Sequence, residues 1–197
     1  MAAVVDGVGD APELPEIVSA IALTITRVGY RRGGLAGMLA ASDLLLDEHE
    51  AVAVTARIDP DGHLHVHWVG DCRAWVWTGE ELRQLTTDHT MGQMLRASGG
   101  EAAERVAATH DHWQRLALSC ATPTTVAEVR GVMLDAGHLV LLTSDGVHSR
   151  LPESVIADLV AKHSGDPQRL ADRLVHAVND DAGDRDDATA VVISGRR

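Results

Sequence analysis

Three aspartates of the sequence, Asp6, Asp145 and Asp186, lie next to short apolar runs that have the composition of β-strands. Asp6 and Asp145 end such runs and are followed by glycine, whereas Asp186 precedes the apolar run 190–193. An Asp at a strand end projects from a rigid element, and several converging carboxylates form an oxygen-lined site for hard divalent cations. Because Asp-Gly pairs are also ordinary turn residues, a turn and a cation site both remain open at this point.

The sequence lacks the spacing that a cysteine-dependent phosphatase needs. A thiolate that cradles a phosphate group needs an Arg six residues later, but Thr78 follows Cys72 and Val126 follows Cys120 at that spacing. No G-x-x-x-x-G-K segment is present, which excludes a P-loop. Two isolated cysteines also form neither a disulfide framework nor a zinc knuckle, so we expect a reducing, cytoplasmic location.

Histidines form two further groups. His63, His65 and His67 alternate on one face of an expected strand, where they could bind a transition metal or, as is more common, pack at the surface or between layers. His110 and His112 lie in a polar segment and could donate a proton to a leaving group or simply be solvated.

The composition is that of a globular protein with an acidic surface. The 197 residues include 17 basic and 29 acidic side chains, a formal net charge of −12, with 45% hydrophobic and 23% charged residues. Such a surface repels phosphate backbones and anionic lipid, so neither nucleic acid nor a membrane is expected as a partner. No signal peptide or apolar membrane-spanning segment is apparent, and no linker divides the chain.

Hydrophobic periodicity predicts the elements that must position these residues. Alternation predicts a β-meander through segments 51–58, 63–69, 74–77 and 81–85, with further strands at 2–5, 124–134, 138–142 and 188–194. Apolar spacing of three to four residues predicts helices that begin at Pro15 and at Pro167, and others over 35–47, 88–98 and 152–162. Segment 99–114 is polar and is expected to be an irregular flap.

Several motifs then make a specific resemblance. Segment 6–9 (DGVG) looks like a D-G-x-G turn, segment 69–74 (VGDCRA) like V-G-D-S-R-A, segment 85–90 (LTTDHT) like L-T-x-D-H-S, segment 141–146 (LLTSDG) like L-L-x-S-D-G, and segment 186–189 (DDAT) like D-N-x-T. In this order and over nearly the whole chain, the motifs resemble the bacterial branch of the metal-dependent serine/threonine protein phosphatases of type 2C, also called the PPM family.

The resemblance implies an α+β fold, a four-layer αββα sandwich of two antiparallel sheets flanked by helices, formed by a single domain over residues 1–197. It also implies two Mn²⁺ or Mg²⁺ ions at one end of the sheets. Asp6 would bridge the ions and the Gly7 carbonyl would bind one. Asp145 and Asp186 would complete these ligands, and Asp88 matches a third-metal position of some bacterial members. A metal-activated water, rather than a protein side chain, would attack phosphorus.

The sequence departs from the family pattern at its beginning. The family opens with a strand carrying R-x-x-N-E-D, whereas this sequence begins at the following strand, so we expect the fold to lack the first strand or strands.

Two functions remain open for a chain with this resemblance. The first is hydrolysis of phosphoserine and phosphothreonine in proteins, in a serine/threonine kinase pathway and by a monomer. The alternative is a catalytically impaired phosphatase-like domain that acts as a regulatory or binding module.

Overall fold

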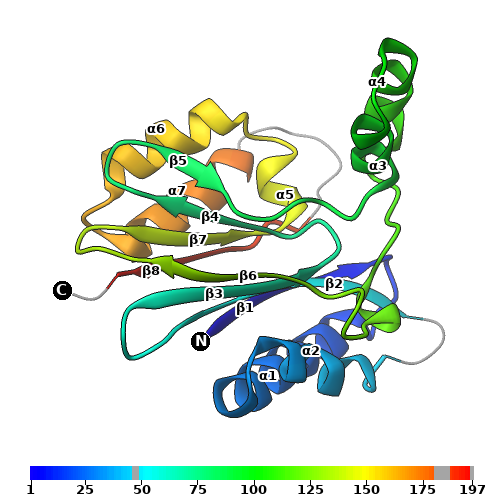
Figure 1. The fold of residues 1–197 in the computed structure, drawn as a ribbon, viewed down its shortest axis with the longest axis horizontal. Coiled ribbons are helices and arrows are strands. Elements are labelled where there is room, and N and C mark those ends of the chain that lie inside the picture. Colours follow the sequence, from blue (N-terminus) through cyan, green and yellow to red (C-terminus); the bar gives the residue numbers. More distant parts are fainter. Residues whose placement is uncertain (46–48, 180–186, 196–197) are drawn as a thin grey trace.

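Two four-stranded antiparallel sheets form the centre of the molecule in the computed structural model, which describes residues 1–45, 49–179 and 187–195 (Figure 1). Sheet A has the order β1-β2-β3-β6, with β1 Ala2–Val8, β2 Glu50–Ile58, β3 His63–Val69 and β6 Ala127–Met133. Sheet B has the order β5-β4-β7-β8, with β5 Leu82–Gln84, β4 Arg73–Trp77, β7 Leu139–Thr143 and β8 Ala190–Ser194.

The inner faces of the two sheets form one apolar layer because their strands alternate with period two. Val54, Leu64 and Val66 from sheet A meet Val76 and Leu142 from sheet B, and all five are buried. This alternation is the pattern that predicted the strands, and side chains of the opposite parity point to the outer faces.

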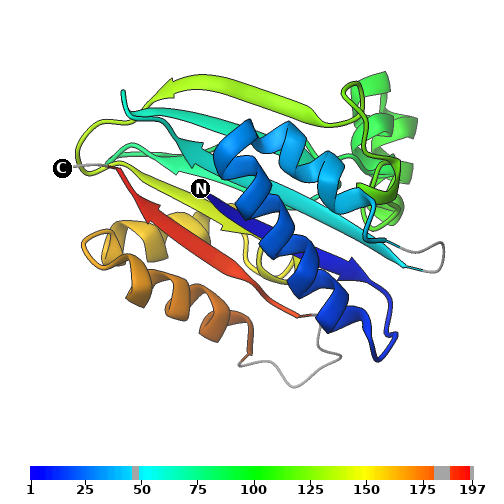
Figure 2. The same ribbon diagram turned by 90° about the horizontal axis from the view of Figure 1, so that it is seen from below.

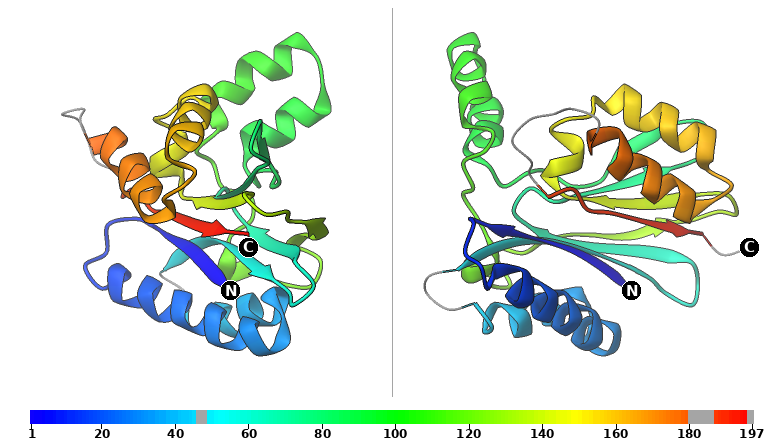
Figure 3. Two further views of the ribbon diagram at one scale, coloured as in Figure 1. Left: turned by 90° about the vertical axis from the view of Figure 1, so that its left-hand side faces the viewer. Right: turned by 180° about the vertical axis from the view of Figure 1, so that it is seen from behind.

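Helices cover both outer faces. On sheet A lie α1 (Leu14–Arg32) and α2 (Gly34–Ser42), and on sheet B lie α6 (Glu153–His163) and α7 (Pro167–Asn179) (Figures 1 and 3). Ile21 and Ile25 of α1 and Leu170 and Leu174 of α7 are fully buried, at the i, i+4 spacing that places them on one helix face. The predicted four-layer αββα sandwich is therefore confirmed. In the part of the chain that the structure describes, no helix has both the length and the apolarity needed to cross a bilayer.

The cover on sheet A is incomplete. Seen from the helix side, α1 and α2 lie over β1, β2 and part of β3, while β6 lies beyond them (Figure 2). Helix α2 is also shorter than the predicted helix over 35–47, because it ends at Ser42 and the following turn closes with i to i−3 hydrogen bonds at Leu44 and Leu45.

A helical hairpin projects from one end of the sandwich, formed by α3 (Met91–Ser98) and α4 (Glu101–Ala107) and followed by a 3₁₀ turn at Ala108–His110 (Figure 1). A second 3₁₀ turn, Leu118–Cys120, lies against β2 and α2. The expectation of an irregular segment over 99–114 is therefore wrong for α4. Gly99 and Gly100 break the first helix, but the acidic start and Ala-rich interior of α4 favour a new one. Its polar composition reflects exposure in a projecting hairpin rather than absence of structure. The predicted helix over 88–98 begins later, at Met91, because the Thr90 side chain accepts a hydrogen bond from Gln93 N–H and caps it.

Candidate functional site

Asp6 and Gly7 lie near the end of β1, where Asp6 pairs with Val52 of β2. Helix α1 packs directly on this turn. A Cβ atom at Gly7 would stand 2.8 Å from Leu14 Cγ and 2.9 Å from Val18 Cγ2, so only glycine permits this approach. The close packing fixes the position of the Gly7 peptide beside the Asp6 carboxylate.

Asp145 begins the short helix α5 (Asp145–His148), directly after β7 of sheet B. Hydrogen bonds hold the chain segment that leads into β8 next to Ser144, the residue before Asp145. Ser144 N–H donates to the Thr189 carbonyl at 3.0 Å, and Thr189 N–H donates to Ser144 Oγ at 3.0 Å. A Cβ at Gly146 would lie 2.5 Å from the Asp187 carbonyl oxygen, so glycine is required here too. The motif around Asp145 and the segment after Asp186 are thus neighbours, whereas Asp186 itself lies outside the described residues.

Asp6 and Asp145 meet in one small pocket of about 170 Å³ between the two sheets, which Gly7, Asp71 and Gln114 also line. Asp6 further lines an adjoining open pocket with Asp187 and Thr189. The structure therefore brings together the predicted residues Asp6, Gly7 and Asp145, although they come from opposite sheets and distant parts of the sequence.

Asp71 is a site residue that the sequence interpretation missed, although it stands within the VGDCRA motif. Asp71 is buried, with only 6% of its surface exposed. Burial, together with the nearby charge of Asp145, raises the pKa of Asp71 to about 6, against a hydrogen bond from Gln114 that lowers it. The pocket thus concentrates negative charge in a site of low solvent access, which a bound cation would relieve.

Asp88, the predicted third-metal residue, lies in a neighbouring pocket of about 380 Å³ that shares Asp71 and Asp145 with the first. Its carboxylate is held by Arg73, whose Nη2 donates to Asp88 Oδ2 at 2.6 Å. The structure therefore places Asp88 near the other acidic residues, but bound to a guanidinium that the sequence interpretation did not include.

Hard oxygen donors dominate the small pocket and fit Mn²⁺ or Mg²⁺ in kind. They are the carboxylates of Asp6, Asp71 and Asp145, the Gly7 peptide, and Gln114, whose Oε1 is buried without a hydrogen-bond partner among the described residues. A group of three or more Asp, Glu, His or Cys side chains spaced to enclose a metal ion does not occur within residues 1–45, 49–179 and 187–195. The donors therefore match a divalent cation by type. Asp186, the remaining predicted ligand, lies outside the described residues.

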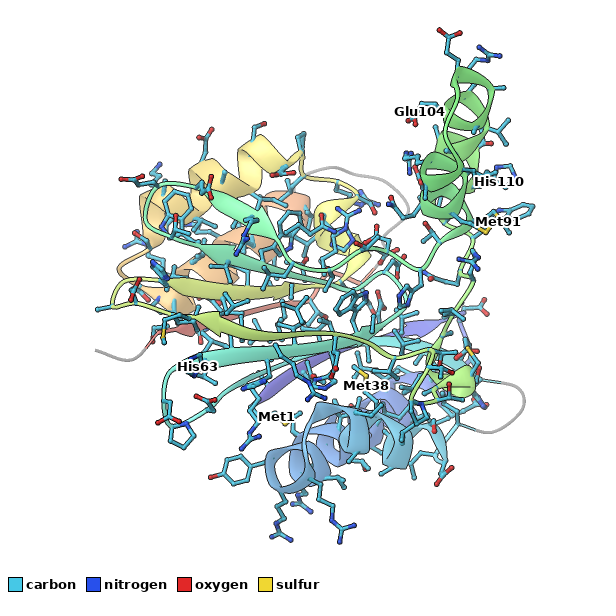
Figure 4. The ribbon with its side chains drawn as sticks, in the orientation of Figure 1. Met1, Met38, His63, Met91, Glu104 and His110 are labelled. Atoms are coloured by element: carbon cyan, nitrogen blue, oxygen red, sulfur yellow. The ribbon has the colours of Figure 1, made fainter. Side chains whose placement is uncertain are left out.

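The two candidate proton donors have different positions. His112 lines both acidic pockets. His110 instead packs edge-on against Trp113, with ring centroids 4.4 Å apart, and lies in the projecting part of the chain (Figure 4). Of the two, only His112 could reach a group bound beside Asp145.

Comparisons with known proteins agree with this geometry. No protein-family model matches the sequence. Protein phosphatase PhpP of Streptococcus pneumoniae is 33% identical over 131 residues, which are 64% of this chain and 50% of PhpP. The PPM Ser-Thr phosphatase MsPP from Mycobacterium smegmatis, solved with cacodylate, superposes with a TM-score of 0.78 at 26% identity and covers 98% of this chain and 87% of MsPP. In sequence and in fold, the chain is thus similar to bacterial Ser/Thr phosphatases of the PPM type.

A more distant serine/threonine phosphatase structure shares the fold. The catalytic domain of the phosphatase PstP, solved with two manganese ions, superposes with a TM-score of 0.70 at 18% identity over 98% of this chain and 86% of PstP. The chain spans about half the length of the curated relatives it matches. These relatives are all described as phosphatases, so the comparisons give no support to the alternative of a catalytically impaired module.

Proposed function

We propose that the protein hydrolyses phosphoserine and phosphothreonine in proteins, with Mn²⁺ or Mg²⁺ as cofactor. The observation that carries this proposal is the meeting of Asp6 and Asp145, from opposite sheets, in one small acidic pocket. The similarity to PhpP and MsPP supports the same activity. Phosphoproteins of a serine/threonine kinase pathway are the proposed substrates, and the proposed form is a cytoplasmic monomer.

Asp6, the Gly7 carbonyl, Asp145 and Asp186 are the proposed ligands of the metal ions, with Asp88 as a ligand of a third. Bound divalent cations supply Lewis acidity to phosphoryl oxygens and to the attacking water. The other oxygen donors of the pocket, Asp71 and Gln114, are proposed to orient water, because both lie within it and Gln114 Oε1 lacks a partner among the described residues.

Proton transfer to the leaving group is assigned to His112, the imidazole that lines both acidic pockets. A protein thiol takes no part. Cys72 is fully buried in the apolar layer between the sheets, and burial raises the pKa of its thiol well above the usual value, so the thiol is neutral.

The test uses the purified chain with para-nitrophenyl phosphate and a phosphothreonine peptide, with and without Mn²⁺, Mg²⁺ and EDTA. Turnover is expected only with added metal. Asp145→Asn should reduce it at least about 100-fold, since Asn keeps the shape but removes charge that holds the ion. Asp6→Asn and Asp186→Asn should act similarly. Asp135→Asn is the matched control, because the Asp135 side chain is 78% exposed and lies outside both pockets.

Mn²⁺ binding, measured by calorimetry, separates the two functions. We expect Mn²⁺ to bind, and Asp145→Asn to abolish or strongly weaken this binding, because the change removes a carboxylate of the acidic pocket. Binding of Mn²⁺ without turnover would favour the regulatory module. Turnover that persists in EDTA would overturn the proposed function.

A further inference from the structure

A second pocket lies on the outer face of sheet A, away from the acidic site. It has a volume of about 450 Å³ and is lined by the end of α1, the start of α2, and side chains of β2, β3 and β6. We call it the basic pocket after the side chains that line it, Arg32, Arg57, Arg130, His65 and His67. Its lining joins the ends of the two helices to Arg57 of β2, His65 and His67 of β3 and Arg130 of β6, so it lies where the helices border the outer face of sheet A.

The strand register separates this pocket from the acidic site. Asp6 pairs with Val52 at one end of β2, whereas Arg57 pairs with His65 near the other end. Figure 4 shows His63, two residues before His65, at the end of the molecule opposite His110 and the projecting hairpin. None of the residues that the structure describes lines both the basic pocket and either of the two acidic pockets.

The charge of the basic pocket is opposite to that of the whole chain. Although the net charge is −12, no Asp or Glu among the residues that the structure describes lines this pocket. Arg32 and Arg57 form no ion pair or side-chain hydrogen bond with any residue that the structure describes. Like charges gathered in this way repel one another, and an anion between them removes that repulsion.

Two carboxylates form ion pairs with side chains that line the pocket. Glu128 pairs with Arg130 at 2.7 Å and with His67 at 3.3 Å, and Asp59 pairs with His65 at 3.1 Å. Burial lowers the pKa of His67, so this imidazole adds no positive charge to that of the arginines at neutral pH. Two of the three arginines remain available to a ligand.

The start of α2 adds backbone donors to the same pocket. Gly33 and Gly34 line it, and no side chain of the described residues caps the helix there. The Gly33 N–H already donates to the Gly29 carbonyl at 2.9 Å, so the donors that the helix offers begin at Gly34. A Cβ at Gly34 would lie 2.5 Å from His67 Nδ1 and 2.8 Å from Thr55 Oγ1, so glycine lets the helix begin directly against the sheet. The first N–H groups of a helix lack intrahelical partners and favour anions.

We propose that the basic pocket binds a phosphate monoester, whose oxygens are held by Arg32, Arg57 and the start of α2. Guanidinium groups bind phosphate oxygens in pairs, and a helix N-terminus stabilises the same negative charge, so the combination favours a doubly charged phosphate over a carboxylate. The phosphate could belong to a phosphorylated peptide or to a nucleotide, because the pocket is larger than a single phosphate ion. This site is independent of the proposed hydrolysis.

The test is an NMR titration of the ¹⁵N-labelled chain in EDTA with inorganic phosphate, a phosphoserine peptide and adenosine monophosphate. The amides of Gly33 and Gly34 should shift and saturate, and Arg32→Gln/Arg57→Gln should weaken the binding at least tenfold. The matched control is Arg83→Gln/Arg105→Gln, which removes the same charge outside the pocket and should bind as the unmodified chain does. Whichever of the peptide and the nucleotide binds with the higher affinity identifies the source of the phosphate.

The acidic site provides an internal reference. Asp145→Asn should leave the shifts of Gly33 and Gly34 unchanged even where hydrolysis is lost, so failure of one site is distinguishable from failure of the other. Should the double variant fold poorly, Arg32→Gln alone suffices, since Arg32 is exposed on the last turn of α1. Absence of saturable shifts at Gly33 and Gly34 with all three probes, or equal affinity in the double variant, would overturn the proposal.

Discussion

Arg73 and Asp88 form a two-pronged ion pair at the rim of the acidic pockets, with Nε to Oδ1 at 3.0 Å and Nη2 to Oδ2 at 2.6 Å. The two side chains are 25% and 15% exposed. Paired guanidinium and carboxylate groups hold each other in a defined orientation. Asp88 is therefore committed to a partner, and a metal ion at this position would have to share its carboxylate with Arg73.

Replacing Arg73 by Gln should destabilise the protein by about 1–3 kcal/mol, because the Asp88 carboxylate would remain largely buried without its charged partner. Urea denaturation in EDTA measures this effect. The double variant Arg73→Gln/Asp88→Asn should lose less than the sum of the single variants, since the two residues interact directly. Arg130→Gln is the control, because its pair with Glu128 is exposed and should contribute less than about 1 kcal/mol. Additive losses at Arg73 and Asp88 would contradict the coupling.

Asp71 should make stability fall as the pH rises. Its pKa is about 6 in the folded protein and 3.8 without the fold, so the folded state binds the proton more tightly. The contribution of Asp71 to the free energy of unfolding is fully present below about pH 4 and is lost as the pH rises through 6. Asp71→Asn, which keeps the shape without the charge, should therefore stabilise the metal-free protein at pH 8 by up to about 3 kcal/mol and have little effect at pH 4.

Urea denaturation at the two pH values, in EDTA, measures this difference. Asp135→Asn removes the same charge from an exposed loop and should change stability little at either pH. An equal gain for Asp71→Asn at both pH values, or a loss at pH 8, would contradict the role assigned to burial of Asp71.

The individual strands and the cluster of aspartates could be predicted from the sequence for physical reasons, whereas the αββα sandwich was an implication of the family resemblance. Residues 63–69 alternate because one face of β3 is apolar, and Asp6 and Asp145 belong to motifs that need glycine for close packing. Asp71 was missed because its defining property is burial beside Asp145, a contact between distant segments. Helix α4 was missed because its residues face solvent, so apolar periodicity was absent.

Cys72→Ser should leave metal-dependent turnover per folded molecule nearly unchanged. The thiol is buried and neutral, so no thiolate chemistry is lost. Stability should nevertheless fall by about 1–3 kcal/mol, because a hydroxyl without a partner replaces an apolar group between the sheets. Turnover and urea denaturation of the same preparation separate the two effects, and Cys72→Ala controls for the hydroxyl. Loss of turnover with the fold preserved would contradict a mechanism without a thiol nucleophile.

His112→Gln should reduce turnover in a way that depends on the leaving group. If His112 protonates the departing oxygen, phenyl phosphate hydrolysis should fall by about 100-fold or more, since phenolate is a poor leaving group that needs the proton. Hydrolysis of para-nitrophenyl phosphate should fall much less, because nitrophenolate departs unprotonated. Rates with both substrates at saturating Mn²⁺ measure the difference. His110→Gln is the matched control, because His110 packs on Trp113 and should leave both rates unchanged. Equal losses on the two substrates would assign His112 to binding rather than to proton transfer.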